Sequence, residues 1–293
     1  MPSPTRASAS ADGAAASGPG VARRLGRQRG AMLGVSILGA LVLLAVGAPM
    51  WSPRDPIRTA AREALQPPGP GHLLGTDQFG RDVASRVVYG ARISLTVGLV
   101  SVSIAVLLGA PLGLVSGFYG GRLDACVMRV MDVLLAFPGI LLALAIVSVL
   151  TPGLTNVMIA VGLAAVPAYA RLMRATALSA REYLYVEAAR ALGGRDPFIL
   201  ARYILPNVIA PLIVTATLGL GTAILSAAAL SFLGLGSQPP APEWGRMLSE
   251  GRDYLREAWW ISTFPGLAIM LMVLAMNLLG DGLRDVLDPR LKT

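Results

Sequence analysis

Long runs without a charged residue constrain the fold of this chain more than any other feature. No Asp, Glu, Lys or Arg occurs in residues 30–53, 93–121, 133–170, 203–242 or 258–280. A helix needs about 20 apolar residues to cross the ~30 Å hydrocarbon layer of a bilayer. The chain is 54% hydrophobic and 14% charged, whereas a typical soluble domain is about 25% charged. The sequence therefore predicts an all-α polytopic membrane protein.

Six transmembrane helices account for these runs. The run 133–170 is too long for one helix, and the turn-forming stretch TPGLTN at 151–156 divides it. We therefore expect spans near 125–150 and 155–175, besides spans in 30–53, 93–121, 208–233 and 258–280. Three prolines are expected to bend their spans: Pro138, Pro167 and Pro211. An even number of spans places both termini on one side of the membrane.

The segments between the spans complete the predicted organisation. Residues 1–29 are rich in Ala, Ser, Gly and Pro and are expected to be a disordered tail. Residues 54–92 form an external loop with an interfacial helix over GRDVASRVVYGARISL, and residues 93–281 form a five-helix core. That core contains a cytoplasmic loop, 176–206, and residues 282–293 are a second tail. With the N-terminus inside, the inner segments hold 16 Arg and Lys residues and the outer segments nine, so both termini are expected to be cytoplasmic.

Rare residue types argue against several kinds of chemistry. The chain has one Cys and one His, too few for an intrachain disulfide or a Cys/His metal site. His72 lies in a loop-like stretch, so we expect no catalytic triad. The only lysine, Lys292, follows no glycine-rich loop, which argues against a phosphate-binding P-loop. We expect no catalytic residue, no metal and no cofactor on this chain, and the net charge of +8 is attributed to cytoplasmic arginines rather than to nucleic-acid binding.

The most charged internal segment is EAARALGGRDPFILARYILP, residues 187–206. The glycine pair at 193–194 predicts the end of one short helix through a left-handed cap. Asp196 is expected to cap a second helix with Pro197 at its first position. Helical spacing places four residues on one face of the first helix: Leu184, Glu187, Ala188 and Ala191. This helix–turn–helix is suited either to docking with a soluble partner or to resting on lipid headgroups.

The spacing of EAARALGG and the ILPN that follows it resembles the cytoplasmic EAA loop of ABC-importer permeases. Three further stretches, HLLGTDQFGRDVASRVVYGARISL, SFLGLGSQPPAPEWGRML and NLLGDGLRDVLDPR, are similar to the C-type permease of dipeptide, oligopeptide and nickel importers. The resemblance covers about residues 30–290. It implies the type I ABC-importer permease fold and a place in the bacterial cytoplasmic (inner) membrane.

The resemblance also implies partners. A homologous second permease would complete a heterodimeric pore, and two cytoplasmic ATPase subunits, or one fused ATPase, would hold ATP and Mg. An extracytoplasmic solute-binding protein would deliver the cargo. The loop would be the coupling element for the ATPase, through Glu187, Ala188, Ala189, Arg190, Gly194, Arg195, Leu205 and Pro206. Ala188 and Ala189 are expected against the ATPase, and Gly194 is expected to make the turn, so that a β-branched residue there would abolish uptake.

A second surface is expected in LGTDQFGRD, where the residues Asp77, Gly80, Arg81 and Asp82 either dock the binding protein or serve only to fold the loop. Di- or oligopeptides are the expected cargo, with nickel or another small solute as the alternative. A stand-alone secondary transporter is disfavoured because the span interiors carry no ionisable residue. A membrane enzyme is disfavoured because the sequence has no usable set of His and Cys residues and no cluster of acidic residues within the spans.

No substrate-binding residue can be assigned from the sequence. The polar residues of the spans are expected mostly to form helix–helix hydrogen bonds, and the sequence does not identify which of them line a pore. They are Thr96, Ser101, Ser103, Asn156, Thr215, Thr217, Thr222, Ser226 and Asn277.

Overall fold

A computed structural model of the protein describes residues 25–26 and 28–287. The expectations for most of the N-terminal tail and for residues 288–293 lie outside this range. Within it the chain is helical, with turns and loops between helices. The helices are α2 (Arg29–Val46), α3 (Ala48–Trp51), η1 (Ala61–Glu63), α4 (Val83–Tyr119), α5 (Gly121–Leu135), α6 (Gly139–Leu150), α7 (Leu154–Arg181), α8 (Leu184–Ala191), α9 (Asp196–Ile199), the π-helical η2 (Leu200–Ile204), α10 (Leu205–Phe232), α11 (Trp244–Gly251), η3 (Arg252–Tyr254) and α12 (Trp260–Leu287).

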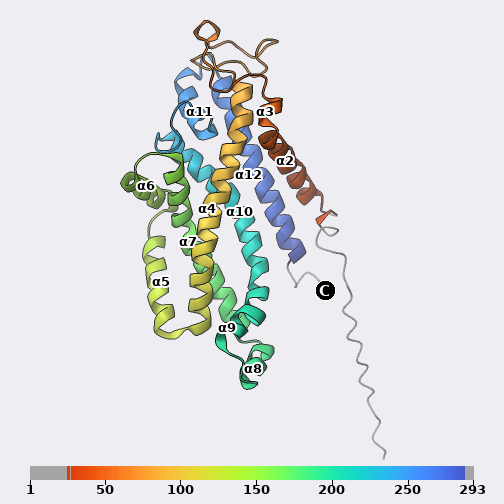
Figure 1. The fold of residues 1–293 in the computed structure, drawn as a ribbon, viewed down its shortest axis with the longest axis vertical. Coiled ribbons are helices and arrows are strands. Elements are labelled where there is room, and N and C mark those ends of the chain that lie inside the picture. Colours follow the sequence, from red (N-terminus) through yellow and green to blue (C-terminus); the bar gives the residue numbers. More distant parts are fainter. Residues whose placement is uncertain (1–24, 27, 288–293) are drawn as a thin grey trace, which may run out of the picture.

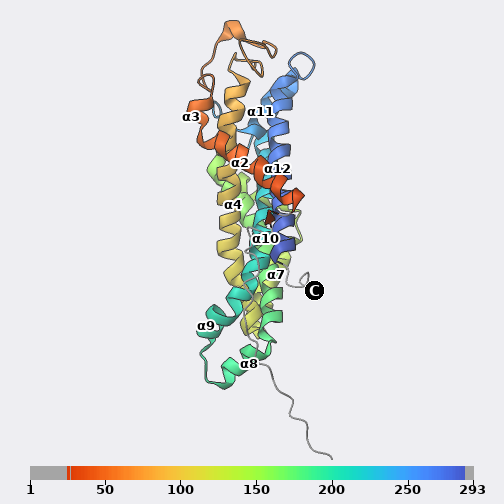
Figure 2. The ribbon, with the colours of Figure 1, turned by 90° about the vertical axis from the view of Figure 1, so that its right-hand side faces the viewer.

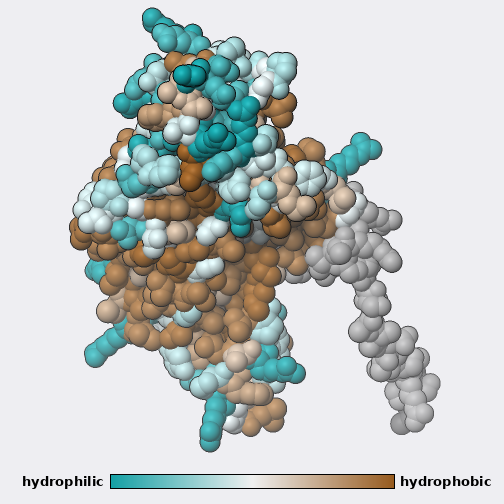
Figure 3. Space-filling model, turned by 45° about the horizontal axis from the view of Figure 1, so that its top comes forward, coloured by the Kyte–Doolittle hydropathy of each residue, from teal (hydrophilic) through white to brown (hydrophobic). Residues whose placement is uncertain are grey.

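The long helices α4, α7, α10 and α12 run along the long axis of the molecule, and α2 lies beside α12 (Figures 1 and 2). Residues 52–82 and α11 form one end, which we call the cap. Helices α8 and α9 form the opposite end (Figure 1). In the face shown in Figure 3, an apolar belt lies between more polar ends. Among the described residues, five helices are long and apolar enough to cross a membrane, or up to six if the bent pair α5–α6 counts as one span.

Helices α4 and α7 pack closely because α4 presents a glycine every fourth residue. A Cβ at Gly109 would lie 2.6 Å from the carbonyl oxygen of Val166, and one at Gly117 would lie 2.7 Å from that of Arg174. Between them, a Cβ at Gly113 would collide with the backbone of Ala170. Small residues let membrane helices approach to backbone contact. The α4–α7 pair is therefore the closely packed centre of the bundle.

The predicted interfacial helix in 54–92 is wrong as a separate element. Asp82 caps the N-terminus of α4, and its carboxylate accepts a hydrogen bond from the N–H of Ser85 at 2.8 Å. From Val83 the helix continues without a break to Tyr119, over 37 residues. The segment expected to lie flat on the membrane is the first part of α4 and is continuous with the second span.

The predicted third span, near 125–150, is not a straight helix. Helix α5 ends at Leu135, α6 begins after Pro138, and the two are bent by 91°. Proline cannot donate the backbone hydrogen bond that would continue α5, so the break falls where a bend was expected. Pro167 and Pro211, in contrast, lie inside the helices α7 and α10. The predicted turn at 151–156 separates α6 from α7, with Thr151 at φ +84°.

The two ends of the described chain meet. The side-chain amide of Gln28 donates a hydrogen bond to the carboxylate of Asp285 at 3.3 Å. Gly34 of α2 and Gly282 of α12 lie at the contact between these helices, where a Cβ on Gly34 would come within 2.9 Å of Ala275 and Leu278. The first and last spans are therefore neighbours, and their ends lie together.

Candidate functional site

The charged segment forms a hairpin, residues 183–206, at the end of the molecule opposite the cap (Figures 1 and 2). Helix α8 ends in two hydrogen bonds. The N–H of Gly193 donates to the carbonyl of Arg190 at 2.9 Å, and the N–H of Gly194 donates to that of Ala189 at 3.0 Å. This pair of bonds is the Schellman motif, which requires a left-handed residue. That residue is Gly193, at φ +79°.

The prediction that Gly194 makes the turn is therefore corrected. Gly193 supplies the left-handed backbone, and Gly194 is needed for a different reason. A Cβ on Gly194 would lie 2.8 Å from the carbonyl oxygen of Ala189 and 3.4 Å from the side chain of Ile199. The first glycine turns the chain, and the second lets α8 approach α9.

One face of the hairpin is buried against the spans. Val186 and Ala189 of α8, with Ile199 and Ile204 beyond the turn, lie in one apolar cluster. The same cluster contains residues of α4 and α7: Ala110, Leu114, Phe118, Met173, Ala177 and Ala180. Ala189 is 9% exposed, so, contrary to the prediction, its side chain is not available to a partner. The hairpin is fixed to the spans by this buried face.

The opposite face of the hairpin is exposed and partly apolar. Leu184 is 82% exposed and Leu192 is 89% exposed. The exposed positions between them are Tyr185, Glu187, Ala188, Arg190 and Ala191. All four residues predicted to share one face of this helix, Leu184 included, are thus exposed. Phe198 adds a further apolar side chain beyond the turn.

Polar and aromatic contacts join the hairpin to three spans. The guanidinium of Arg190 lies over the ring of Phe118, at the end of α4, 5.3 Å from its centroid. The side-chain amide of Asn207, in α10, donates a hydrogen bond to the hydroxyl of Tyr185 at 2.9 Å. Because the buried face also contacts α7, a displacement of the hairpin acts on α4, α7 and α10 together.

The second half of the hairpin runs directly into α10. Arg195, which is exposed, occupies the cap position of α9, so Asp196 begins this helix and makes no capping hydrogen bond, contrary to the prediction. A π-helical turn at 200–204 follows, in which the N–H of Leu205 donates to the carbonyl of Leu200. The wider turn accommodates the ring of Pro206, which would clash with a carbonyl four residues earlier. Leu205 and Pro206 therefore connect the hairpin to the fifth span without a loop.

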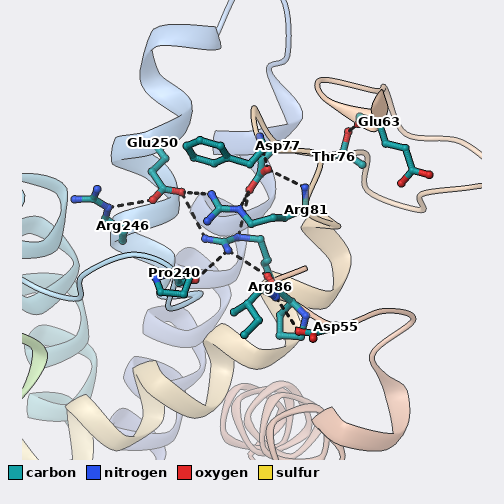
Figure 4. Close-up of polar contacts among 12 residues, drawn as sticks. Asp55, Glu63, Thr76, Asp77, Arg81, Arg86, Pro240, Arg246 and Glu250 are labelled. Carbon is teal, nitrogen blue, oxygen red and sulfur yellow. Dashed lines mark hydrogen bonds and ion pairs between the residues drawn. The ribbon is translucent and has the colours of Figure 1, made fainter. Parts of the chain in front are cut away.

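A buried network of charged residues holds the cap together (Figure 4). The guanidinium of Arg81 pairs with Asp77 at 2.5 Å and with Glu250 of α11 at 2.7 Å. Arg86, in the first turn of α4, lies 3.6 Å from Asp77 and 3.5 Å from Glu250. Arg246 pairs with Glu250 from the side of α11. The network therefore joins the loop, α4 and α11.

The residues expected to dock a binding protein lie inside this cap. Asp77, Arg81 and Asp82 are 2–3% exposed, and Gly80 turns the chain at φ +72° against the backbone of Ala60. The expectation that these side chains dock the binding protein is therefore corrected. The alternative expectation applies, in which these residues fold the loop. His72 is buried as well: its ring nitrogens lie 2.9 Å from Asp82 and 3.3 Å from Glu63, and it packs the loop.

Glu243 fixes the start of α11 on the same side of the molecule. Its carboxylate accepts hydrogen bonds from the N–H groups of Gly245 and Arg246, both at 2.8 Å. Burial raises the pKa of Glu243, and these two bonds act in the opposite direction. In the described residues no group of three or more His, Cys, Asp or Glu side chains is arranged to hold a metal.

A cavity of about 460 Å³, open to the surface on one side, lies between α4, α6, α7 and α10. Four of the polar span residues named above line it: Ser101, Thr215, Thr222 and Ser226. The sequence could not select them, because the lining of the cavity comes from four helices that are far apart in the sequence. The rest of its wall is formed by Tyr169, glycines and aliphatic side chains.

Residues 109–293 match the family described as the binding-protein-dependent transport system inner membrane component. The chain belongs to this family. Residues 20–68 also match the N-terminal transmembrane domain of oligopeptide transport permease C. The predicted resemblance to the C-type permeases of dipeptide, oligopeptide and nickel importers is confirmed.

Close relatives extend over nearly the whole chain. The dipeptide transport system permease protein of Alkalihalophilus pseudofirmus is 48% identical over 92% of this chain and 89% of its own. A di/tripeptide transport system permease protein of Pseudomonas aeruginosa is 48% identical over 90% and 89%. The glutathione transport system permease protein of Pectobacterium atrosepticum is 46% identical over 87% and 86%.

The fold matches a solved transporter. A structure of the MetNI methionine ABC transporter in an inward-facing conformation has a TM-score of 0.57 and 22% identity. The match covers 68% of this chain and 95% of the matched MetNI chain. The predicted fold class, an all-α polytopic permease of the type I importer kind, is confirmed, and the chain is a multi-pass permease of the inner membrane.

Proposed function

We propose that this chain is the membrane-spanning permease subunit of an ATP-driven importer of di- and oligopeptides, and that separate ATPase subunits move it through the hairpin. The cargo is supported by the names of the relatives, which refer to dipeptides, di- and tripeptides and glutathione. ATP and Mg belong to the ATPase subunits in this proposal, and the permease performs no hydrolysis.

The exposed face of the hairpin carries the proposal. Leu184 and Leu192 are more exposed than most apolar side chains of the chain, although the hairpin lies beyond the ends of α4, α5 and α7 (Figure 1). Contiguous exposed apolar surface is typical of an interaction site. Its distance from the apolar belt favours a protein cleft over lipid headgroups as the partner. Because the opposite face is buried in the spans, force applied here reaches the pore.

This assignment fixes the orientation and the remaining partners. The hairpin faces the cytoplasm, and so do the ends of α2 and α12. The cap then faces outward, where a solute-binding protein delivers the peptide. A homologous second permease completes the pore, and the family description, which names a binding-protein-dependent system, supports the solute-binding protein as a partner.

Reconstitution tests the function directly. The chain is co-expressed with the second permease and the ATPase subunits, placed in proteoliposomes, and supplied with peptide-loaded binding protein. We expect peptide uptake that requires ATP and all the subunits. Uptake by this chain alone would instead establish a secondary transporter, and uptake of nickel but not of peptide would correct the cargo.

Charge placed on the exposed face tests the coupling. Leu192→Asp should remove the ATPase from the purified complex and reduce uptake at least tenfold, because it buries a carboxylate in an apolar contact. Leu255→Asp is the matched control, since Leu255 is 53% exposed next to α11 and the cap. Full ATPase retention in Leu192→Asp, with normal uptake, contradicts the role of the hairpin.

A further inference from the structure

The cavity between α4, α6, α7 and α10 has a consistent chemistry. Among the residues that the structure describes, none of those that line it is Asp, Glu, Lys, Arg or His. Its polar side chains are hydroxyls, and the remainder of its wall is small or aliphatic. A volume of about 460 Å³ is roughly fifteen times the ~30 Å³ share of one water molecule in the liquid. The cavity is therefore large enough for a short peptide group with accompanying water.

Three of the hydroxyls lie on one face of α10. Thr215, Thr222 and Ser226 are seven and four residues apart, so they follow one another along the side of α10 that lines the cavity. In the described part of the chain none of the three side chains makes a hydrogen bond. Thr217, on the same helix, does not line the cavity, and its hydroxyl donates to the carbonyl of Ile213. The cavity face of α10 thus carries polar groups without partners.

The other two polar side chains of the cavity are already engaged. Ser101 of α4 donates a hydrogen bond to the carbonyl of Met158 at 3.0 Å. Tyr169 of α7 donates to the carbonyl of Thr215 at 3.3 Å and lies against Gly219. These two bonds connect neighbouring helices around the cavity. They leave the α10 hydroxyls as the polar groups that can contact a passing molecule.

We propose that this cavity is the passage for the cargo in this subunit, and that the three α10 hydroxyls contact the peptide backbone of the cargo while nothing in the cavity selects by side-chain charge. A hydroxyl both donates and accepts hydrogen bonds, so it suits the N–H and the C=O of a peptide equally. The spacing agrees: about 10 Å from Thr215 to Thr222 and about 6 Å from Thr222 to Ser226 along the helix. An extended peptide advances about 3.3 Å per residue, so these steps correspond to about three and two residues.

Weak and repeated contacts suit transport, because a translocated molecule must also leave each site. Since the wall offers no charged partner, peptides with acidic, neutral or basic side chains pass by the same contacts. The inference rests on the proposed function and adds to it the chemical class that the pore accepts.

The test uses the reconstituted complex with three tripeptides that differ only in a central Ala, Glu or Lys, at saturating binding protein. In the wild type the maximal uptake rates are expected to agree within about twofold. Thr222→Asp should favour the Lys peptide over the Glu peptide at least tenfold, because a carboxylate on the cavity wall attracts the basic side chain and repels the acidic side chain of a peptide that passes close to it. Thr222→Asn, of the same size and uncharged, should show no preference.

A second pair of variants tests the hydroxyls. The double variant Thr215→Val/Thr222→Val should slow all three peptides about fivefold, as expected for the loss of an ordinary hydrogen bond. Thr217→Val should leave the rates unchanged. If Thr222→Asp does not insert, Thr222→Cys in a Cys126→Ser background can be given either charge with methanethiosulfonate reagents.

The outcomes separate the two claims. A wild-type complex that carries no peptide refutes the proposed function. A wild type that carries peptides, with no charge preference in Thr222→Asp or in the modified cysteine variant, refutes the inference alone. Normal rates in the double valine variant refute the backbone contacts.

Discussion

At the scale of single residues, the two glycines of the hairpin have different tasks. Gly193 has the left-handed backbone, and Gly194 leaves space for the carbonyl of Ala189. The pattern of an EAA segment followed by Gly-Gly predicts a turn, but it does not say which glycine has positive φ. That depends on where α8 ends, and helix ends are uncertain by one or two residues in any sequence pattern.

A substitution series at Gly193 separates backbone conformation from side-chain size. Gly193→Asn should retain most uptake, because Asn tolerates the left-handed region. Gly193→Val should lose it, since a β-branched residue at φ +79° is strained by about 1–3 kcal/mol. No atom lies within 4 Å of a Cβ at this position, so crowding does not explain a difference. ATP-dependent uptake in proteoliposomes is the measurement, and equal activity in the two variants contradicts the assignment.

At the scale of helices, the sequence predicts where the helices lie better than it predicts whether a helix is continuous or broken. The charge-free runs indicate where the helices lie because water-free lipid demands apolar side chains. They do not show that α4 continues through Gly90 and Ala91, or that α5 and α6 diverge by 91°. A signal for the start of α4 was present: Asp82 three residues before Ser85 is a capping pattern. The angle at Pro138 depends on packing against α7, which no local pattern encodes.

The contact between α4 and α7 makes a prediction about glycine. Gly113→Ala should lower the stability of the permease by about 1–3 kcal/mol or more, because the new methyl group meets the backbone of Ala170. Gly39→Ala, in α2, should be neutral or slightly stabilising, since nothing lies within 4 Å of its Cβ and Ala favours helix. Thermal unfolding in detergent compares the two. Equal melting temperatures would show that the α4–α7 contact does not limit stability.

At the scale of the whole molecule, the cap depends on contacts between distant parts of the chain. Glu250 lies 169 residues from Arg81, and both belong to one network with Asp77 and Arg86. The sequence shows charged residues in two separate loops, and nothing in their spacing pairs them. For this reason the sequence leaves open whether Asp77 and Arg81 dock a partner or fold the loop, whereas in the structure both side chains are buried. The same limit applies to the cavity, whose lining comes from four helices.

Removing one carboxylate tests how much the cap depends on this network. Glu250→Gln leaves two buried guanidinium groups, those of Arg81 and Arg86, short of negative charge, and it should cost about 3–5 kcal/mol. Glu257→Gln is the control, because Glu257 is exposed. Limited proteolysis of residues 52–82 and thermal unfolding report the difference. Identical protection in both variants would mean that apolar packing alone holds the cap.

Helix α4 touches both ends of the molecule, since Arg86 in its first turn belongs to the cap network and Phe118 near its last turn contacts Arg190 of the hairpin. Its 37 residues extend over about 55 Å. A stiff rod of this length that tilts by about 10° around its centre moves its two ends by about 5 Å in opposite directions. In the proposed complex, linkage makes this effect reciprocal: a binding protein that favours one tilt at the cap changes, by the same free energy, the affinity of the hairpin for the ATPase.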